Sequence, residues 1–202
     1  MEFFAGPSRE LAIVCAGYAL GCVSPGYYLV RVRSGRDIRT INSRSTGSTN
    51  VGRVLGRPGY IVTLLADSAK GGLAVGAALY FGVSLWGTIC AMLAVVSGHI
   101  WPVQLGFHGG KGLATGFGAL IVLDYRLALL LGSIAVLGPV LGLGTVSFLA
   151  AAIASPAVAA VLARPKIEVA GLGVLVLLVL VAHRDNIRAF FAERRRRKGL
   201  PA

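Results

Sequence analysis

The sequence has few charged residues and very few acidic ones. Asp, Glu, Lys and Arg make up 14% of its 202 residues, against about 25% in an ordinary soluble domain. Only 8 residues are Asp or Glu while 20 are Lys or Arg, so the formal net charge is +12, and 55% of the chain is hydrophobic. This apolar content excludes a disordered chain and a water-soluble nucleic-acid binder, whose basic face needs polar surface around it. The composition predicts a single-domain integral membrane protein, residues 1–202, with one basic side.

Cysteine is also scarce, with three in the chain. Cys15, Cys22 and Cys90 lie in apolar segments and are odd in number, so we interpret them as small hydrophobic residues rather than a disulfide framework. The first apolar segment lacks a basic region before it, because Arg9 is followed by Glu10. This argues against a cleaved signal peptide.

Long apolar runs are abundant. A membrane-spanning helix needs about 20 mostly apolar residues, and the runs predict an all-α protein with seven transmembrane helices. The expected spans are Leu11–Val30, Tyr60–Phe81, Gly82–Trp101, Leu113–Leu123, Leu127–Leu143, Thr145–Ala163 and Val169–Val181. The fourth is short, so it must borrow glycine-rich residues before it or sit partly inside the bundle.

Seven crossings divide the charges unequally. One side receives the loops at 31–57, 102–112 and 143–146 and the tail after residue 182, together with all but four of the Lys and Arg residues. The other side receives four basic and four acidic residues, which cancel: Arg9, Arg126, Arg164, Lys166, Glu2, Glu10, Asp124 and Glu168. The positive-inside rule then predicts a cytoplasmic C-terminus and an outside N-terminus.

Polar residues gather on the expected cytoplasmic side. The segment from Asp37 to Arg53 is rich in hydroxyls, amides and arginine, and 107–115 combines glycines with Lys111. The second segment is no nucleotide P-loop, because Leu105 and Gly112 stand where that motif needs Gly and Ser or Thr. Helices are expected to begin on this side near Pro58, Lys111 and Thr145. Their N-termini would together favour a phosphate or carboxylate from the cytosol, with apolar helices nearby for a lipid chain.

Three further polar features lie in or beside the spans. Asp67 and Lys70 are three residues apart on one helix face, which suits a structural ion pair or a direct catalytic role. His183 and Asn186 have the same spacing where the last span leaves the membrane, and Ser147 begins the sixth span.

Taken together, these motifs resemble the acyl-phosphate-dependent glycerol-3-phosphate acyltransferases of the PlsY type. The resemblance covers nearly the whole chain. The matching motifs are Gly21 and Gly26, Asp37-Ile38-Arg39, Gly47-x-Thr49-Asn50-Val51-x-Arg53, Asp67-x-x-Lys70-Gly71, Gly98-His99-x-x-Pro102, Phe107-x-Gly109-Gly110-Lys111-Gly112-x-Ala114-Thr115, Val146-Ser147 and His183-x-x-Asn186. The glycine-lysine block is the most specific of these.

The resemblance implies seven transmembrane helices in a bacterial cytoplasmic (inner) membrane, with the active site facing the cytoplasm. The implied reaction moves a fatty acyl group from acyl phosphate to the sn-1 hydroxyl of glycerol 3-phosphate, giving lysophosphatidic acid and phosphate. No cofactor, metal or nucleic acid is implied. The implied catalytic residues are Ser43, Arg53, Lys111, His183 and Asn186. The implied substrate-binding residues are Thr49, Asn50, Gly109, Gly110, Gly112 and Ser147.

Within this assignment, Arg53 and Lys111 would neutralise the phosphates of donor and acceptor. Backbone N–H groups of the glycine loop would stabilise charge on the reacting carbonyl oxygen. The base would be either His183 or a phosphate oxygen of the substrate.

The chain departs from the family pattern at several positions. Asn42-Ser43-Arg44-Ser45 stands where the family usually has Gly-Ser-Gly-Asn, which makes the loop more basic and less flexible. His108 stands where a basic residue usually precedes the Gly-Gly-Lys. After Asn186 the usual Gly-x-Glu is missing, although Glu193 follows. These changes leave activity and substrate identity open.

Two other functions remain as alternatives. One is a transporter of small anions or lipid phosphates, although we detect no inverted repeat. The other is a catalytically weak paralogue that binds anionic lipid through the Arg194–Lys198 tail. The His-x4-Asp motif of another acyltransferase class is absent, because His99, His108 and His183 all lack an Asp five residues later.

Overall fold

The computed structural model describes residues 6–140 and 145–197. The described residues form helices and no strand. The elements are α1 (Pro7–Cys22), α2 (Pro25–Ser34), the 3-10 turn η1 (Ile38–Thr40), α3 (Ser48–Tyr80), α4 (Leu85–Ile100), the 3-10 turn η2 (Val103–Leu105), α5 (Leu113–Leu123), α6 (Tyr125–Val140), α7 (Thr145–Val161) and α8 (Lys166–Arg197). Each expected span has its counterpart, with α1 and α2 together occupying the first. Glu2, Leu143 and Lys198 lie outside the described residues.

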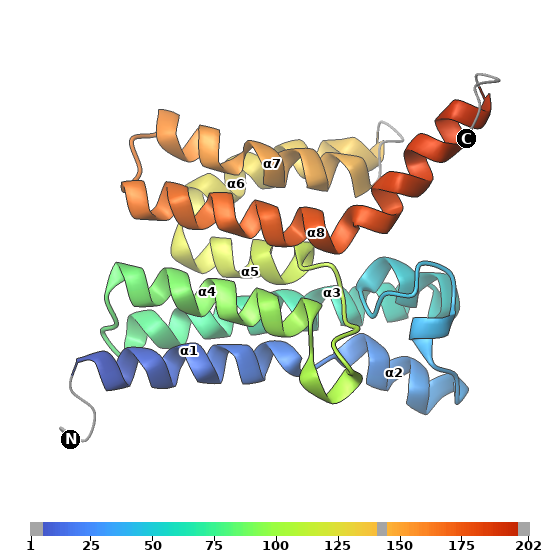
Figure 1. Cartoon of the computed structure of the whole chain (residues 1–202), viewed down its shortest axis with the longest axis horizontal. Helices are drawn as coiled ribbons and strands as arrows, with labels where there is room; N and C mark the ends of the chain where they lie inside the picture. The colour runs from blue at the N-terminus through green and yellow to red at the C-terminus, as the bar shows by residue number, and fades with distance from the viewer. Residues whose placement is uncertain (1–5, 141–144, 198–202) are drawn as a thin grey trace.

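The helices run side by side along the long axis of the molecule (Figure 1). The group of α1, α3 and α4 and the group of α6, α7 and α8 lie on opposite sides of α5, which contacts members of both. Four stretches are long and apolar enough to cross a membrane: Pro7–Ser34, Ser48–Tyr80, Leu85–Leu105 and Lys166–Ala189. The apolar stretches Leu113–Leu123, Tyr125–Ala135 and Val146–Val161 are shorter. The short α5 lies partly inside the bundle: its middle residues are buried, whereas Ile121 and Val122 are exposed.

The first expected span, Leu11–Val30, is not one continuous helix. It breaks at Val23 and Ser24, because Pro25 has no N–H to donate and restricts the residue before it. The carbonyl groups released by the break are bound by side chains. Ser24 Oγ and Gln104 Nε2 donate to Cys22 O, and Lys70 Nζ donates to the carbonyls of Gly21 and Val23.

The second expected span begins earlier than predicted. The segment 31–57 was expected to be a loop and the helix to begin near Pro58, but α3 starts at Ser48. Gly56 interrupts the helix with a φ of 70° and a ψ of −166°, two residues before Pro58. Proline is tolerated in the first turn of a helix, so α3 consists of a short polar piece, Ser48–Leu55, followed after this kink by the apolar helix.

Two pairs of contacts bring helix backbones unusually close. A side chain at Gly21 would collide with the carbonyl oxygen of Val95, and one at Gly98 with that of Tyr18, which fixes α1 against α4. In the same way, Gly71 and Gly118 fix α3 against α5. Small residues at such positions are typical of packed membrane helices. The close packing fixes the positions of α3, α4 and α5 relative to their neighbours, and so the positions of the polar residues at their ends.

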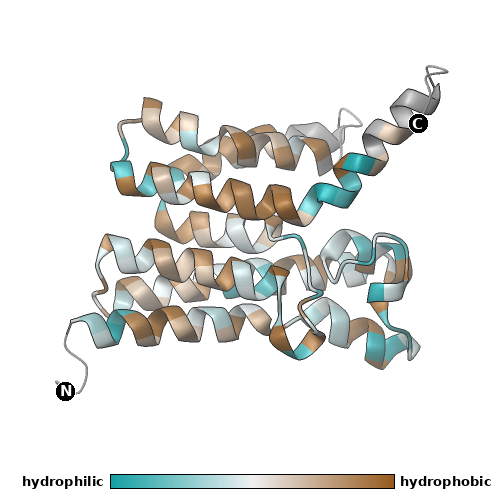
Figure 2. Cartoon of the chain, viewed as in Figure 1, coloured by the Kyte–Doolittle hydropathy of each residue, from teal (hydrophilic) through white to brown (hydrophobic). Residues whose placement is uncertain are grey.

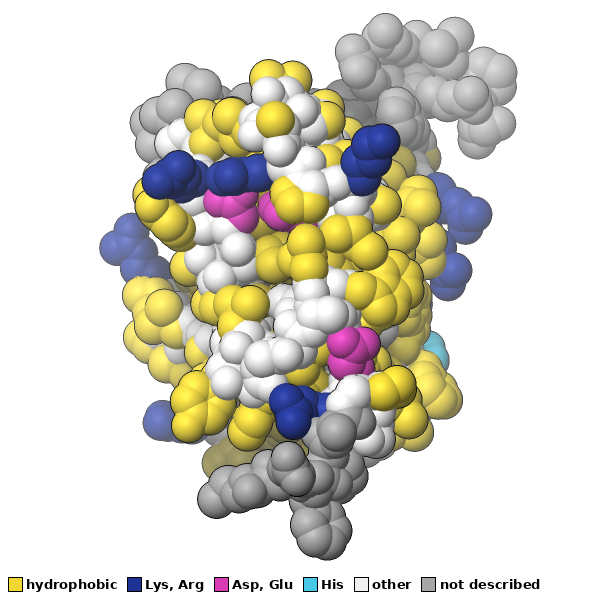
Figure 3. Space-filling view, turned by 90° about the vertical axis from the view of Figure 1, so that its left-hand side faces the viewer, with side chains coloured by type: hydrophobic (Ala, Val, Ile, Leu, Met, Phe, Trp, Pro, Cys, Tyr) yellow, Lys and Arg dark blue, Asp and Glu magenta, His cyan; other side chains and the backbone are white. Residues whose placement is uncertain are grey.

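The two ends of the bundle differ in polarity. We call the end with residues 35–47 and 101–112 the loop end, and the end with the turns at 81–84, Asp124 and 162–165 the turn end. Hydrophilic residues gather at the loop end (Figure 2), which confirms that the loops 31–57 and 102–112 share one end. At the turn end, acidic and basic side chains are interspersed among apolar ones (Figure 3).

Candidate active site

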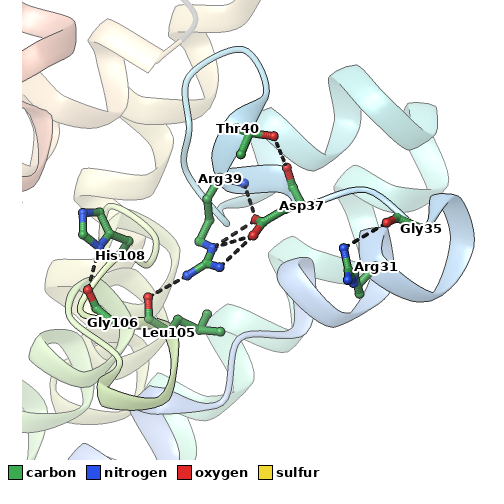
Figure 4. A network of polar contacts seen from close by, with 8 residues as sticks. All are labelled: Arg31, Gly35, Asp37, Arg39, Thr40, Leu105, Gly106 and His108. Carbon is green, nitrogen blue, oxygen red and sulfur yellow. Dashed lines mark hydrogen bonds and ion pairs between the residues drawn. The ribbon is translucent and has the colours of Figure 1, made fainter.

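Two loops that are distant in the sequence are joined at the loop end (Figure 4). Arg39 binds the carboxylate of Asp37 through Nε and Nη2, and its Nη1 donates to the carbonyl of Leu105 at 2.7 Å. Hydrogen bonding to Arg39 lowers the pKa of Asp37 below its ordinary value. The backbone N–H of Thr46 donates to the carbonyl of Gly109 at 3.2 Å. The segment before α3 and the glycine loop before α5 therefore form one wall.

A polar pocket of about 590 Å³ lies behind this wall. Residues from α3, α4, α5, α8 and the two loops line it. The lining comprises Ser43, Ser45, Gly47, Ser48, Thr49, Asn50, Arg53, Asp67, His99, Lys111, Gly112, Leu113, Ala114, His183 and Asn186. All five expected catalytic residues, together with Thr49, Asn50 and Gly112, thus meet in one place.

Two helices begin at this pocket. Gly47, Ser48 and Thr49 form the N-terminus of α3, and Gly112 and Leu113 form that of α5. The first turn of a helix leaves backbone N–H groups without partners in the helix and carries partial positive charge. Two of the three expected N-termini therefore converge, although the α3 terminus is at Ser48 instead of Pro58. The described side chains of the first turn of α7, Val146 and Ser147, do not line this pocket.

Arg53 and Lys111 face the pocket without an acidic partner. Within residues 6–140 and 145–197, no salt bridge involves either side chain. Partial burial, and to a smaller degree the positive charge of Arg53, lower the pKa of Lys111 to about 8, although the negative charge of Asp185 opposes the shift. Two neighbouring cations beside two helix N-termini form a site for an anion such as phosphate.

His183 lies on the α8 side of the pocket and is buried. Its Nδ1 lies 2.8 Å from the carbonyl oxygen of Val179. A carbonyl oxygen only accepts hydrogen bonds, so Nδ1 carries the proton and Nε2 keeps its lone pair. His183 is therefore able to accept a proton through Nε2. Asn186 follows one turn later and lines the same pocket.

A second, apolar cavity of about 550 Å³ adjoins the polar pocket. It lies between α5, α6, α7 and α8 and is lined by side chains such as Phe117, Leu131, Phe148 and Leu175. Gly112 and Leu113 line both cavities. An anion site thus lies next to a space suited to a hydrocarbon chain.

Comparisons with known proteins agree with this geometry. The chain matches the family described as "Glycerol-3-phosphate acyltransferase" over residues 11–193. It is 43% identical over 182 residues to glycerol-3-phosphate acyltransferase 1 of Desulfitobacterium hafniense (strain Y51), covering 89% of each chain. The chain belongs to the glycerol-3-phosphate acyltransferase family.

Other members of the family are also similar. The glycerol-3-phosphate acyltransferase of Parasynechococcus marenigrum (strain WH8102) is 39% identical over 183 residues, covering 90% of this chain and 86% of the relative. The crystal structure of PlsY (YgiH), an integral membrane glycerol 3-phosphate acyltransferase, in its glycerol 3-phosphate form gives a TM-score of 0.84 at 29% identity, over 92% of this chain and 94% of that chain. Its lysophosphatidic acid form gives a TM-score of 0.80 at 28% identity, over 92% and 93%.

Some expected site residues of this family member have other contacts in the structure. The N–H groups of Gly109 and Gly110 donate to the carbonyls of Ile100 and His99, at 3.1 and 2.9 Å. These two N–H groups are therefore not available to a substrate oxygen, contrary to the expectation for the glycine loop. Ser147 Oγ donates to the carbonyl of Ala135 at 3.0 Å, and Ser147 does not line the polar pocket.

Asn50 lines the pocket, but its amide is engaged by the protein. Its Nδ2 donates to the carbonyls of Ile38, Ile41 and Ser45, and its Oδ1 accepts from the backbone N–H of Ser43. An amide with these four partners has little capacity left for a ligand. We therefore replace the expected substrate-binding role of Asn50 with a positioning role for the loop that carries Ser43.

Two titratable residues of the pocket lining, Asp67 and His99, were not predicted as site residues. Asp67 was expected in an ion pair, which the structure confirms, with Lys70 Nζ 2.9 Å from Asp67 Oδ1. However, Asp67 also reaches the pocket wall together with His99. The sequence did contain a signal for Asp67: charged side chains inside a membrane span cost free energy, so they are usually functional. His99 belongs to the Gly98-His99-x-x-Pro102 motif, but its place at the pocket beside Asp67 follows only from the packing of α3 against α4.

Proposed function

We propose that this protein is a membrane acyltransferase that transfers a fatty acyl group from acyl phosphate to the sn-1 hydroxyl of glycerol 3-phosphate. The products are lysophosphatidic acid and inorganic phosphate. The observation that carries the proposal is the polar pocket, where two unpaired cations, two helix N-termini and the lone pair of His183 meet. The names of the related enzymes and the adjoining apolar cavity support the same substrate class.

Binding follows from the charges. Arg53 and Lys111, with the N-termini of α3 and α5, hold the phosphate groups of donor and acceptor. The hydroxyls of Ser43 and Thr49 line the same pocket and donate to substrate oxygens. The acyl chain lies in the apolar cavity, so that its reactive end is near Gly112, which both cavities share.

The transfer step needs a proton acceptor. The sn-1 hydroxyl oxygen attacks the carbonyl carbon of acyl phosphate while His183 Nε2 takes the hydroxyl proton. The bond between that carbon and the bridging phosphate oxygen then breaks, and phosphate leaves with its charge balanced by Lys111 and Arg53. The hydrogen bond from His183 Nδ1 to Val179 favours His183 over a substrate phosphate as the base, because it keeps the lone pair on Nε2.

The loop end is placed at the cytoplasmic face of a bacterial inner membrane, with the N-terminus outside. Support comes from the positive-inside rule, because the loop end carries the excess of Lys and Arg. The orientation is testable with single cysteines in a chain whose native cysteines are replaced. Arg36→Cys should react with a membrane-impermeant thiol reagent only from the cytoplasmic side, and Gly82→Cys only from outside. The reverse pattern would contradict the orientation.

The function itself is tested with purified protein in lipid. Long-chain acyl phosphate and glycerol 3-phosphate are supplied together, and phosphate release and lysophosphatidic acid are measured. Product should form only when both substrates are present. Absence of product at every acceptor concentration would contradict the proposal. Uptake of labelled phosphate into protein-containing vesicles, without turnover, would instead support the transporter alternative.

A further inference from the structure

Three buried side chains between α3 and α4 form a cluster that the proposed reaction does not yet use. Asp67, Lys70 and His99 are each at most 4% exposed. Lys70 Nζ lies 2.9 Å from Asp67 Oδ1 and 2.8 Å from His99 Nδ1, and His99 Nδ1 lies 3.4 Å from Asp67 Oδ1. Asp67 and His99 line the polar pocket, whereas Lys70 lies behind them. The cluster therefore connects the pocket wall to the interior of the bundle.

Lys70 is surrounded by acceptors. Besides Asp67 and His99, its ammonium group donates to the carbonyls of Val23 and Gly21, at 2.7 and 3.2 Å, where α1 breaks. An ammonium group has donors only. Its contact with His99 therefore requires a lone pair on Nδ1. With Asp67 negative and Lys70 positive, a neutral His99 also leaves the buried cluster without net charge, which burial favours.

The 2.8 Å contact of Nδ1 with Lys70 Nζ is shorter than its 3.4 Å contact with Asp67 Oδ1, which favours the tautomer of neutral His99 that carries its proton on Nε2. That nitrogen makes no hydrogen bond with any described residue, and it is not among the buried side-chain atoms that lack a partner. His99 as a residue lines the pocket. Its Nε2 edge lies directly against Gly110, where any side chain would collide with Nε2. The Nε2–H group is therefore on the ring edge that faces the glycine loop just before Lys111.

We propose that His99 is a further catalytic residue, which donates a hydrogen bond from Nε2 to an anionic substrate oxygen and is held in the required tautomer by Lys70. The inference rests on the proposed function for the identity of the substrate. The recognised oxygen belongs to a phosphate group or to the carbonyl under attack. Lys70 is a positioning residue, because it touches no open part of the pocket and acts through His99.

His99 and His183 then have opposite parts in one reaction. His99 presents a proton and cannot act as the base, because Lys70 occupies its Nδ1 lone pair. His183 presents a lone pair, because its own Nδ1–H is bound by Val179. A single pocket thus contains one imidazole that donates and one that accepts, and the backbone and Lys70 decide which is which.

The tautomers are tested directly by NMR on ¹⁵N-histidine-labelled protein in lipid. The chain has only 3 histidines, so His108→Gln and His183→Gln each assign one signal by its disappearance, and the remaining signal belongs to His99. We expect His99 to be protonated at Nε2 and His183 at Nδ1. Lys70→Met should release His99 toward protonation at Nδ1, facing Asp67. Protonation of wild-type His99 at Nδ1 would overturn the proposal, and this measurement needs no variant of the cluster to fold.

The donor role is tested by the choice of substitution. Gln places an amide N–H near the position of Nε2, whereas Asn reaches only as far as Nδ1. We expect His99→Gln to retain activity within about tenfold, while His99→Asn and His99→Ala lose about a hundredfold or more, in the range for removal of one oxyanion donor. The matched control is His108→Gln. His108 is exposed in the loop that follows α4, so this variant should behave like wild type. Equal losses in His99→Gln and His99→Ala would contradict the donor role.

Inorganic phosphate distinguishes the two possible oxygens. If His99 binds a phosphate group, titration with inorganic phosphate shifts its Nε2 signal, and the weakened variants show a raised KM. If it binds the reacting carbonyl oxygen, phosphate leaves the signal unchanged and the variants lose kcat alone. If phosphate shifts no His99 signal and the variants show no change in kcat or KM, the inference is overturned. Lack of acyltransferase activity in the wild type would instead refute the proposed function, while the tautomer and phosphate measurements still decide the role of His99.

Discussion

The two ends of the bundle use charged and polar side chains differently. At the turn end, charges pair with each other or with the adjacent turns: Arg164 Nη2 donates to Asp124 Oδ1 at 2.9 Å, and the backbone N–H of Ser84 donates to Glu10. At the loop end the backbone leaves regular helix at Val23, Gly56 and residues 101–112, and Lys70 binds the carbonyls of Gly21 and Val23 at the first of these breaks. Asn50 binds carbonyls of the segment 38–45 before α3. In the pocket at this end, Arg53 and Lys111 have no acidic partner among the described residues. At the turn end, charged side chains therefore stabilise the turns between helices. At the loop end, positive charge remains available for a ligand.

Removal of the unpaired cations should have the largest effect on catalysis. Lys111→Ala and Arg53→Ala each remove a positive charge from the anion site, so we expect losses of about a hundredfold to a thousandfold in kcat/KM. Arg126→Ala is the matched control, because it removes an exposed cation at the turn end, and its activity should stay within about twofold of wild type. Steady-state phosphate release in lipid measures all three. A large loss in Arg126→Ala would remove the distinction between the two ends.

The loop end should also impose a pH dependence that the turn end does not. Lys111 is protonated below its pKa of about 8 and neutral above it. Its attraction for phosphate is thus present at neutral pH and lost as pH rises, so log(kcat/KM) should fall with a slope approaching −1 above about pH 8. The Lys111→Arg variant stays charged throughout this range. The fall of log(kcat/KM) above about pH 8 should therefore be absent in Lys111→Arg. If this variant shows the same fall, a group other than Lys111 causes it.

Disruption of the turn end should affect stability and leave catalysis intact. Arg164→Ala leaves the buried carboxylate of Asp124 without its partner, which should cost about 1–3 kcal/mol of folding free energy. Thermal unfolding in detergent measures the loss, and kcat/KM of the protein that remains folded should not change. A selective fall in kcat would show that the turn end communicates with the pocket.

The smallest expected effect concerns the backbone of the loop that carries Ser43. Asn42 and Arg44 have φ values of 49° and 55°, at the two positions where the family usually has glycine. Such a conformation costs a residue like Arg about 1 kcal/mol, whereas Asn tolerates it better. Arg44→Gly should therefore raise stability by up to about 1 kcal/mol, and Asn42→Gly by less. Destabilisation by Arg44→Gly would show that the Arg44 side chain has a role of its own.

The sequence predicted the elements that depend on local pattern. Apolar runs located the helices, and the three-residue spacing of Asp67 and Lys70 predicted their ion pair. Pro25 was present as a signal for the break between α1 and α2, but the uninterrupted apolar run outweighed it. The polar first piece of α3 was missed because its helix lies outside the apolar part of the span and shows no apolar periodicity.

Features that depend on packing could not be predicted. The meeting of Lys70 with His99 requires that α3 and α4 lie side by side, and the carbonyls that Lys70 binds exist only because α1 breaks. The role of Asn50 depends in the same way on the path of the loop around it. For Gly109 and Gly110, sequence reasoning assigned the backbone N–H groups to a ligand, whereas the carbonyls of Ile100 and His99 in α4 accept their hydrogen bonds.

Gly112 is where the two cavities meet, and its φ of 84° is strained for residues with a side chain. A Cβ there would lie within 3.0 Å of Val96 Cγ1 and 3.2 Å of Ile100 Cδ1. Gly112 and Leu113 line both cavities, so these two adjacent residues form the border between the polar and the apolar space. A molecule bound across it would pass from polar to apolar surroundings at these two residues. This border, rather than either cavity alone, would set where along an amphiphile the protein acts.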